Sequence, residues 1–305
     1  MTCYRCGEVI ESEDKIIHGL HEKCFVEWFA LEGDENFKDV TIKSAISADP
    51  KEEDHSAGMA SSFFQGKFKK YSAELNGKKY ILKVKDDKFP ELPGVEFLCN
   101  NIAVFFGINV PKFYFIKFEN SLETFVSKNF MPDFGTADLV HIYHFFKKGE
   151  EFSFEVIINI LKKQTERLED VNRFVELCFF DALIGNHDRH GRNLAIVRKA
   201  KKCFLSPFYD NPAYLGTEEK ELLGAIHEPK GKIAVKNTIE PSIKDYYREA
   251  KRLGYLDVAA NFIKKIDLKE IKKLIDDAFI SSKRKKAFFS LVERRYAEVG
   301  DEIQK

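Results

Sequence analysis

The segment LIGNHDRHGRNLAIV, residues 183–197, constrains the fold more than any other part of the chain, together with FLSPFYDNP at residues 204–212. The first segment places Asp188 five residues before Asn193, and the second places Asp210 in a turn after an apolar run. Phosphoryl transfer needs such a set: a carboxylate that orients the attacking hydroxyl, and further oxygen ligands that hold Mg²⁺ on the phosphates. The segments therefore indicate loops that meet in one cleft.

Kinase catalytic loops space the base and the metal-binding asparagine as Asp-x-x-x-x-Asn, which here reads DRHGRN. This spacing predicts Asp188 as the base, with Asn193 and Asp210 as Mg²⁺ ligands. A motif this short also occurs by chance, for example in a polar turn that caps a helix. The residues upstream must therefore decide between the two interpretations.

A lysine and a glutamate upstream fit the same chemistry. Lys83 lies in KKYILKV, a predicted strand whose other central residues are apolar, and Glu96 opens the predicted helix 95–107. A strand lysine paired with a helix glutamate is how protein kinases fix the cation that binds ATP phosphates. The alternative is a lysine that leans out of an edge strand, since lysine is seldom buried unless it is paired.

The hydrophobic periodicity changes once along the chain. Short alternating runs with an Asn76-Gly77 hairpin signal fill residues 61–123, and helical periodicity dominates beyond residue 138. This order predicts an α+β, bilobal protein-kinase-like fold with a β-rich N-lobe and a helical C-lobe. The predicted divisions are a zinc-binding module at 1–32, a linker at 33–57, the N-lobe at 58–134 and the C-lobe at 135–305.

Composition excludes several classes of protein. Lys+Arg and Asp+Glu both number 49, so net charge gives no reason to expect a membrane partner or direct nucleic-acid binding. No apolar run approaches the roughly 20 residues that span a bilayer. The first residues lack a signal-peptide pattern, so we expect a cytoplasmic protein. Three scattered cysteines, Cys99, Cys178 and Cys203, are expected to be buried apolar residues.

The first residues hold a second motif, Cys3-x2-Cys6 followed by His21-x2-Cys24. Two close pairs of soft ligands are typical of a structural Zn²⁺ site with Cys₃His coordination, and the pattern resembles half of a LIM-type finger. His18 could compete with His21. The alternative is a degenerate module with reduced cysteines and no metal. A module this small is expected not to share a core with the lobes.

Three segments in order, residues 81–111, 183–197 and 205–210, resemble those of HipA-like kinases, and the likeness spans about 58–214. These are toxin kinases of toxin–antitoxin modules, and the shorter HipT-type members are the most similar. The resemblance implies an ATP- and Mg²⁺-dependent serine/threonine protein kinase. It also implies a protein substrate, with aminoacyl-tRNA synthetases the first class to test, and raises an antitoxin protein as a partner.

Residue by residue, the resemblance implies a role for each matching position. Lys83 would bind the ATP phosphates with Glu96 as its partner, and Asp188 would act as the base. Asn193 and Asp210 would bind Mg²⁺, and His190 would organise the catalytic loop. The backbone near Lys128 and Phe130 would bind adenine.

The segment GMASSFFQGK, residues 58–67, occupies the place of the family's loop over the phosphates. The resemblance implies ATP contacts from Gln65 and Lys67. Phe63 stands where the family usually has Gly, and Phe lacks the backbone freedom of Gly. Close approach of this loop to the phosphates is therefore an open question.

Two serines in this loop, Ser61 and Ser62, are predicted sites of inhibitory autophosphorylation. The alternative is that they are ordinary turn residues, since Ser is common in turns.

Two further functions stay open. DRHGRN also occurs in the catalytic loop of phosphoinositide lipid kinases, which need a basic surface to meet an anionic bilayer. The only dense basic cluster, KRKK at residues 283–286, is equally explained by a solvated helix face. The second alternative is a zinc-anchored pseudokinase that binds a partner without catalysis.

Overall fold

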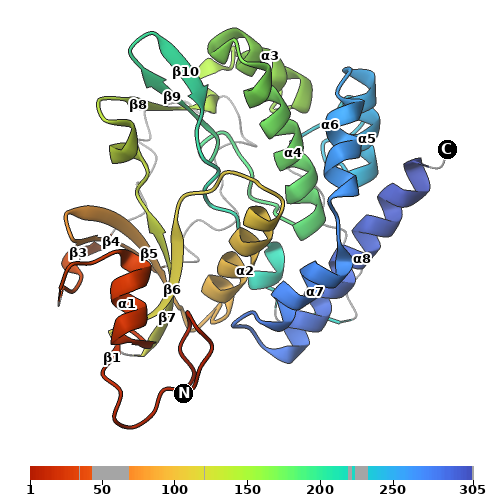
Figure 1. The fold of residues 1–305 in the computed structure, drawn as a ribbon. Coiled ribbons are helices and arrows are strands. Elements are labelled where there is room, and N and C mark those ends of the chain that lie inside the picture. Colours follow the sequence, from red (N-terminus) through yellow and green to blue (C-terminus); the bar gives the residue numbers. More distant parts are fainter. Residues whose placement is uncertain (34, 43–68, 120, 219–221, 224–232, 304–305) are drawn as a thin grey trace.

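The computed structural model describes residues 1–33, 35–42, 69–119, 121–218, 222–223 and 233–303. The chain forms a β-rich lobe and a helical lobe, with helix α2 (Leu92–Phe105) between them (Figure 1). Within the described ranges, no helix is long and apolar enough to cross a membrane.

The N-lobe is built on a five-stranded antiparallel sheet. Its order is β3 (Lys38–Ile42), β4 (Lys69–Leu75), β5 (Lys78–Val84), β7 (Leu122–Lys128) and β6 (Phe113–Phe118). Asn76 and Gly77 join β4 to β5 and have φ values of 50° and 65°. Positive φ at both central residues belongs to a type I′ turn, which explains the predicted hairpin. Strand β3 lies within the residues predicted as a linker.

Helix α2 begins at Leu92, three residues before the predicted start, because Pro93 fits the first helical turn. The helix is apolar almost all round, and it packs between β6 and β7 of the sheet and the C-lobe helix α7 (Leu268–Asp276). Its buried polar residues are Glu96 and Asn100. They lie one helical turn apart and so share one face.

The N-terminal module shares the core of the N-lobe. It consists of β1 (Ile16–Ile17), β2 (Leu20–His21) and α1 (Glu22–Phe29), and α1 lies against the sheet (Figure 1). Phe29 stacks on Tyr114 of β6 with ring centroids 4.0 Å apart. One continuous apolar cluster joins Phe25 and Phe29 to residues of the sheet. The expectation of separate cores was therefore wrong, because the aromatic face of α1 needs the sheet to bury it.

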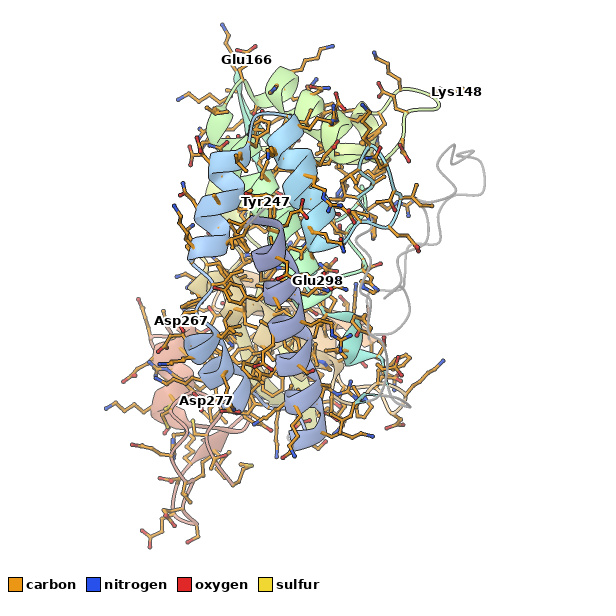
Figure 2. The ribbon with its side chains drawn as sticks, turned by 90° about the vertical axis from the view of Figure 1, so that its right-hand side faces the viewer. Lys148, Glu166, Tyr247, Asp267, Asp277 and Glu298 are labelled. Carbon is orange, nitrogen blue, oxygen red and sulfur yellow. The ribbon has the colours of Figure 1, made fainter. Side chains whose placement is uncertain are left out.

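The C-lobe packs its helices around α4 (Leu168–Ile184), which is almost wholly buried toward its C-terminus. The other helices are α3 (Phe154–Thr165), α5 (Ile243–Arg252), α6 (Leu256–Lys264), α7 and α8 (Ser282–Ile303). Figure 2 shows α8, which carries Glu298, crossing one side of the lobe beside α7, whose ends are marked by Asp267 and Asp277.

A small three-stranded sheet extends from this lobe, in the order β10 (Lys202–Leu205), β9 (Ala195–Lys199) and β8 (Asp138–His141). Short 3₁₀ turns cover Met131–Phe134, Ile142–Phe145 and Tyr214–Gly216.

The structure modifies the interpretations of the basic cluster 283–286 and of one of the three scattered cysteines. Arg284, from the basic cluster 283–286, is buried and donates to the carbonyl oxygens of Leu215 and Glu218, so that cluster is not a uniformly solvated face. Cys99 and Cys178 are buried in the large core, as expected, while Cys203 packs at its margin and is half-buried.

Candidate active site

A cavity of about 540 Å³ lies where the two lobes meet. Its walls come from β4, β5 and β7 of the N-lobe, from β8, and from the segment that connects the lobes at residues 128–131. The charged and polar side chains that line it include Lys70, Lys83, Glu96, Arg192 and Asp210. The cavity therefore gathers cations and carboxylates from segments far apart in the sequence.

Lys83 is at the centre of these charges. It lies on β5, is 4% exposed, and its Nζ donates to Glu96 Oε1 at 2.5 Å and also to Asp210 Oδ1. Burial disfavours the ammonium, but Asp210 and Glu96 together raise the pKa of Lys83 to about 12. The lysine is therefore a fixed cation at neutral pH, held from α2 on one side and from the segment after β10 on the other.

Asp210 faces the cavity with its carboxylate partly exposed. Although burial opposes ionisation, Lys83 and Lys70 hold the pKa of this carboxyl well below its ordinary value. Its φ of 53° lies in the left-handed region, which Asp tolerates better than most residues. A strained backbone at a charged cavity residue is typical of functional sites.

The catalytic segment begins where α4 ends, at Gly185, whose φ of 74° provides a left-handed cap. Asp188 then donates its backbone N–H to Asn186 Oδ1 at 2.9 Å. Asn193 closes the loop, because its Nδ2 donates to the Asp188 carbonyl at 2.5 Å while its Oδ1 accepts from the His190 N–H at 2.9 Å. The two predicted site residues Asp188 and Asn193 are thus joined by one direct hydrogen bond, from the Asn193 amide to the Asp188 carbonyl.

Asp188 and Asn193 are both buried, at 5% and 2% exposed, and lie outside the lining of the large cavity. The catalytic segment contributes Arg192 to that lining instead.

His190 is held as a neutral acceptor. Its Nδ1 accepts the Arg192 N–H at 3.1 Å. Burial, helped by the charges of Arg189 and Arg192, lowers the pKa of His190 to about 4 despite attraction from Asp210. A ring that is neutral and accepts a backbone hydrogen bond fits the predicted role of organising the loop.

The connecting segment is where adenine was predicted to bind. Lys128 pairs with Tyr80 in the sheet, and its Nζ bonds Asp133 Oδ1 at 2.6 Å. The Phe130 ring lies 5.9 Å from that of Tyr209, between centroids, and both residues line the cavity. An apolar wall beside the connecting segment suits a flat heterocycle. The predicted residues of the phosphate loop, Ser61, Ser62, Gln65 and Lys67, lie outside the described residues.

Sequence reasoning missed a buried polar group that begins at the cavity wall, where Asn100 is a lining residue. Arg189, 1% exposed, forms a two-pronged ion pair with Asp181 of α4 at 2.7 and 3.0 Å. Asn211 and Asn100 extend this group toward α2. One signal was available: an aspartate in the apolar run LCFFDALI must be buried, and a buried carboxylate needs a cationic partner.

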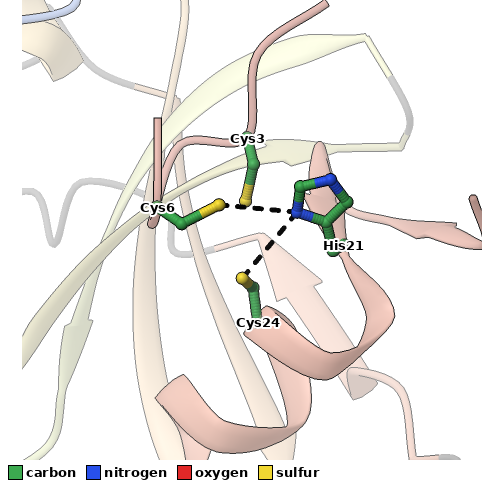
Figure 3. Close-up of side chains that lie close together, drawn as sticks. All are labelled: Cys3, Cys6, His21 and Cys24. Carbon is green, nitrogen blue, oxygen red and sulfur yellow. Dashed lines mark hydrogen bonds between the residues drawn. The ribbon is translucent and has the colours of Figure 1, made fainter. Parts of the chain in front are cut away.

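The four predicted metal ligands of the N-terminal module come together at one point (Figure 3). His21 Nδ1 lies 3.5 Å from Cys6 Sγ and 3.9 Å from Cys24 Sγ. All four ligand atoms, including Cys3 Sγ, lie within 4.8 Å of one another. Ligands on a tetrahedron at about 2.0–2.3 Å from Zn²⁺ lie roughly 3.3–3.8 Å apart, so the distances from His21 to Cys6 and Cys24 suit that ion.

The surroundings orient these ligands. His21 Nε2 lies 3.3 Å from the Val9 carbonyl, which leaves Nδ1 as the ligand atom. Although burial opposes it, backbone hydrogen bonds from Cys6 and Arg5 lower the pKa of the Cys3 thiol to about 7. His18 is engaged elsewhere, with the Lys117 carbonyl at 3.1 Å and Asn36 Oδ1 at 2.7 Å, and takes no part in the cluster.

Comparison with known proteins identifies a matching family and similar folds. The family model of the HipA-like C-terminal domain matches residues 41–279. The chain is similar to the Helicobacter pylori proinflammatory kinase CtkA, with a TM-score of 0.62 and 20% identity, over 76% of this chain and 92% of that chain.

It is also similar to a chain in the complex of the Shewanella oneidensis MR-1 toxin–antitoxin system HipA, HipB and its operator DNA. There the TM-score is 0.53 and the identity 15%, over 72% of this chain and 58% of that chain. No curated protein matches the sequence. At these identities the likeness concerns the fold, and the predicted bilobal kinase-like architecture is confirmed.

Proposed function

Because the chain belongs to the family of HipA-like C-terminal domains, as its predicted resemblance indicated, we propose that it is an ATP- and Mg²⁺-dependent serine/threonine protein kinase. The observation that carries this proposal is the engagement of Lys83 with both Glu96 and Asp210 at the inter-lobe cavity. A lysine fixed between a helix glutamate and a metal-binding aspartate is how kinases place ATP phosphates.

Asp210 and Lys83, the two predicted site residues of opposite charge that line the cavity, fit Mg·ATP. Asp210 offers an ionised oxygen in the cavity, as Mg²⁺ requires, and Lys83 offers a fixed cation for the phosphates. When bound, Mg²⁺ would neutralise charge that develops on the transferred phosphoryl group. Asp210 and Asn193 would hold the metal, the backbone near Lys128 and Phe130 would hold adenine, and Asp188 would accept the proton of the attacking hydroxyl. His190 would keep the catalytic segment in shape.

The phosphoacceptor is proposed to be a protein Ser or Thr hydroxyl. The solved complex of HipA with HipB and operator DNA supports an antitoxin partner as a hypothesis for this chain. Aminoacyl-tRNA synthetases remain the first substrate class to test. Ser61 and Ser62 remain the proposed autophosphorylation sites, and Gln65 and Lys67 the proposed phosphate contacts.

The N-terminal cluster is proposed to hold one structural Zn²⁺ through Cys3, Cys6, His21 and Cys24. Four protein ligands leave no open position for a substrate, so a catalytic role is not proposed.

Nucleotide binding tests the proposed function. Calorimetric titration of the purified chain with a non-hydrolysable ATP analogue should show binding that strengthens when Mg²⁺ is present. Asp210→Ala should remove the Mg²⁺ dependence, whereas Asp133→Ala, which loses only an exposed pairing with Lys128, should retain it. Absence of nucleotide binding by the wild-type chain would refute the kinase and favour a binding module. Phosphorylation of phosphoinositide vesicles without protein phosphorylation would favour the lipid-kinase alternative.

A further inference from the structure

The residues that follow the two proposed catalytic aspartates are joined to each other. Arg189 comes directly after Asp188, Asn211 comes directly after Asp210, and Arg189 Nη2 donates to Asn211 Oδ1 at 2.6 Å. From Asn211 the connection continues to Asn100 on α2, the helix that carries Glu96. We infer that Asn100 and Asn211 are positioning residues that keep α2, and with it Glu96, in register with the catalytic segment. This inference rests on the proposed function.

The connection starts from a rigid anchor. Arg189 is 1% exposed, and Asp181 of α4 holds its guanidinium through two hydrogen bonds. The remaining donors of Arg189 reach the carbonyl oxygens of Tyr209 at 3.0 Å and Asn193 at 3.3 Å. One side chain thus contacts both the end of the catalytic segment and the residue before Asp210. A planar guanidinium with five fixed donors suits this role.

Asn211 connects Arg189 to helix α2. It is 0% exposed, and its Nδ2 donates to Asn100 Oδ1 at 3.1 Å and to the Phe208 carbonyl at 3.0 Å. Because its Oδ1 already accepts from Arg189, the orientation of the amide is fixed by its partners.

Asn100 completes the connection. It is 3% exposed, and its Nδ2 donates to the Glu96 carbonyl at 2.8 Å. Its Oδ1 is the acceptor for Asn211, so both ends of this amide are also committed.

The side-chain amides of Asn100 and Asn211 fix the position of α2 more narrowly than apolar residues of the same size would. Burying them costs free energy unless every donor and acceptor is satisfied, and here each satisfies the next. Apolar packing tolerates small slips, whereas a hydrogen bond weakens steeply when distance or angle changes. The set therefore specifies one position of α2 relative to the catalytic segment. Since a misplacement of about 1 Å can slow an enzyme about a hundredfold, that position matters for transfer.

The chain provides a matched control on the same helix. Asn101 Nδ2 donates to the Phe97 carbonyl at 3.0 Å, the same backbone bond one residue along, and Asn101 has no hydrogen bond to Asn211. Asn100→Ala and Asn101→Ala therefore remove the same local bond, and only the first breaks the connection.

The test combines two measurements on wild-type chain, Asn100→Ala, Asn101→Ala, Asn211→Ala and the Asn100/Asn211 double variant. The first is the steady-state rate of Mg·ATP turnover, with ATP hydrolysis as the probe. We expect kcat to fall about tenfold or more in each single variant except Asn101→Ala, with the KM for ATP changing less than about threefold. The double variant should be no slower than the worse single variant, because the connection is already broken.

The second measurement is hydrogen–deuterium exchange in residues 92–105, which does not depend on turnover. Asn211→Ala should accelerate exchange in helix α2, although residue 211 lies outside that helix. Asn101→Ala should accelerate exchange only in the helical turn that contains residue 101. If Asn211→Ala does not fold, Asn211→Ser, which places a small polar hydroxyl in the buried position, replaces it.

The outcomes separate the two claims. Equal kcat values for Asn100→Ala and Asn101→Ala in an active protein, or unchanged exchange in Asn211→Ala, would overturn this inference alone. A wild-type chain that does not turn over Mg·ATP would contradict the proposed function, and the exchange result would still decide whether the amides hold α2.

Discussion

Lys83 Nζ lies 2.5 Å from Glu96 Oε1, so an ion pair joins strand β5 to helix α2 at the wall of the inter-lobe cavity. The same ammonium also bonds Asp210, which the fold brings from 127 residues away. Three charges from three segments therefore satisfy one another in a site where each alone would be costly to bury.

Removing the Lys83 ammonium should strongly slow phosphate transfer. In Lys83→Met we expect the rate of phosphate transfer to fall by at least about a hundredfold, because the phosphates lose their fixed charge while two carboxylates stay close together. Loss of one partner from a buried ion pair also destabilises by about 3–5 kcal/mol, so folding is checked by circular dichroism. The control is Lys79→Met, an exposed lysine on the same strand, whose rate should match wild type.

Metal removal should destabilise more than the first 32 residues. Since Phe25 and Phe29 share a core with the sheet, chelation should lower the thermal midpoint of the whole N-lobe by at least about 5 °C. Cys6→Ser should have the same effect, and Cys203→Ser, outside the cluster, should not. Elemental analysis checks for one zinc per chain. A chelated protein that melts like the untreated one would contradict the shared core or the metal.

The stacking of Phe29 on Tyr114 can be tested separately from the metal. Phe29→Ala should cost about 3–5 kcal/mol of unfolding free energy, the usual effect of emptying an aromatic core site. Urea unfolding followed by the fluorescence of Trp28, the neighbouring residue, measures this cost. A loss below about 1 kcal/mol would show that α1 does not depend on the sheet.

His190 should make the folded state sensitive to acid. Its pKa is about 4 when folded and near 6.5 in the unfolded chain. As the pH falls from about 6.5 to about 4, the unfolded chain binds a proton that the folded chain excludes, so stability falls by up to about 3 kcal/mol. His190→Asn keeps an acceptor for the Arg192 N–H and should flatten this slope. Equal slopes for variant and wild type would refute the assignment.

Local patterns in the sequence predicted which residues lie together in part of the candidate site. Lys83 and Glu96 follow from an alternating strand and the helix after it, and Asp188 and Asn193 lie within one loop. The connection from Arg189 to Asn211 and Asn100 could not be predicted, because Asn211 and Asn100 are 111 residues apart and no sequence pattern pairs their side chains. Their partners become visible only when the lobes are packed together.

The module and the linker show a second limit. The aromatic residues of α1 predict one buried face but do not say against what it is buried. Residues 38–42, KDVTI, contain too few apolar residues to be separated from a linker by periodicity, and they become a strand because β4 offers a free edge.

Transfer of labelled phosphate from ATP tests the central claim most directly. Wild-type chain, Asp188→Ala and Asp210→Ala are each incubated with γ-labelled ATP and Mg²⁺, and modified residues are mapped by mass spectrometry, including Ser61 and Ser62. The account predicts Mg²⁺-dependent labelling of Ser or Thr by the wild type and none by either variant, while Asp188→Ala still binds ATP, because that side chain serves the hydroxyl rather than the nucleotide. Undiminished labelling by either variant would contradict it.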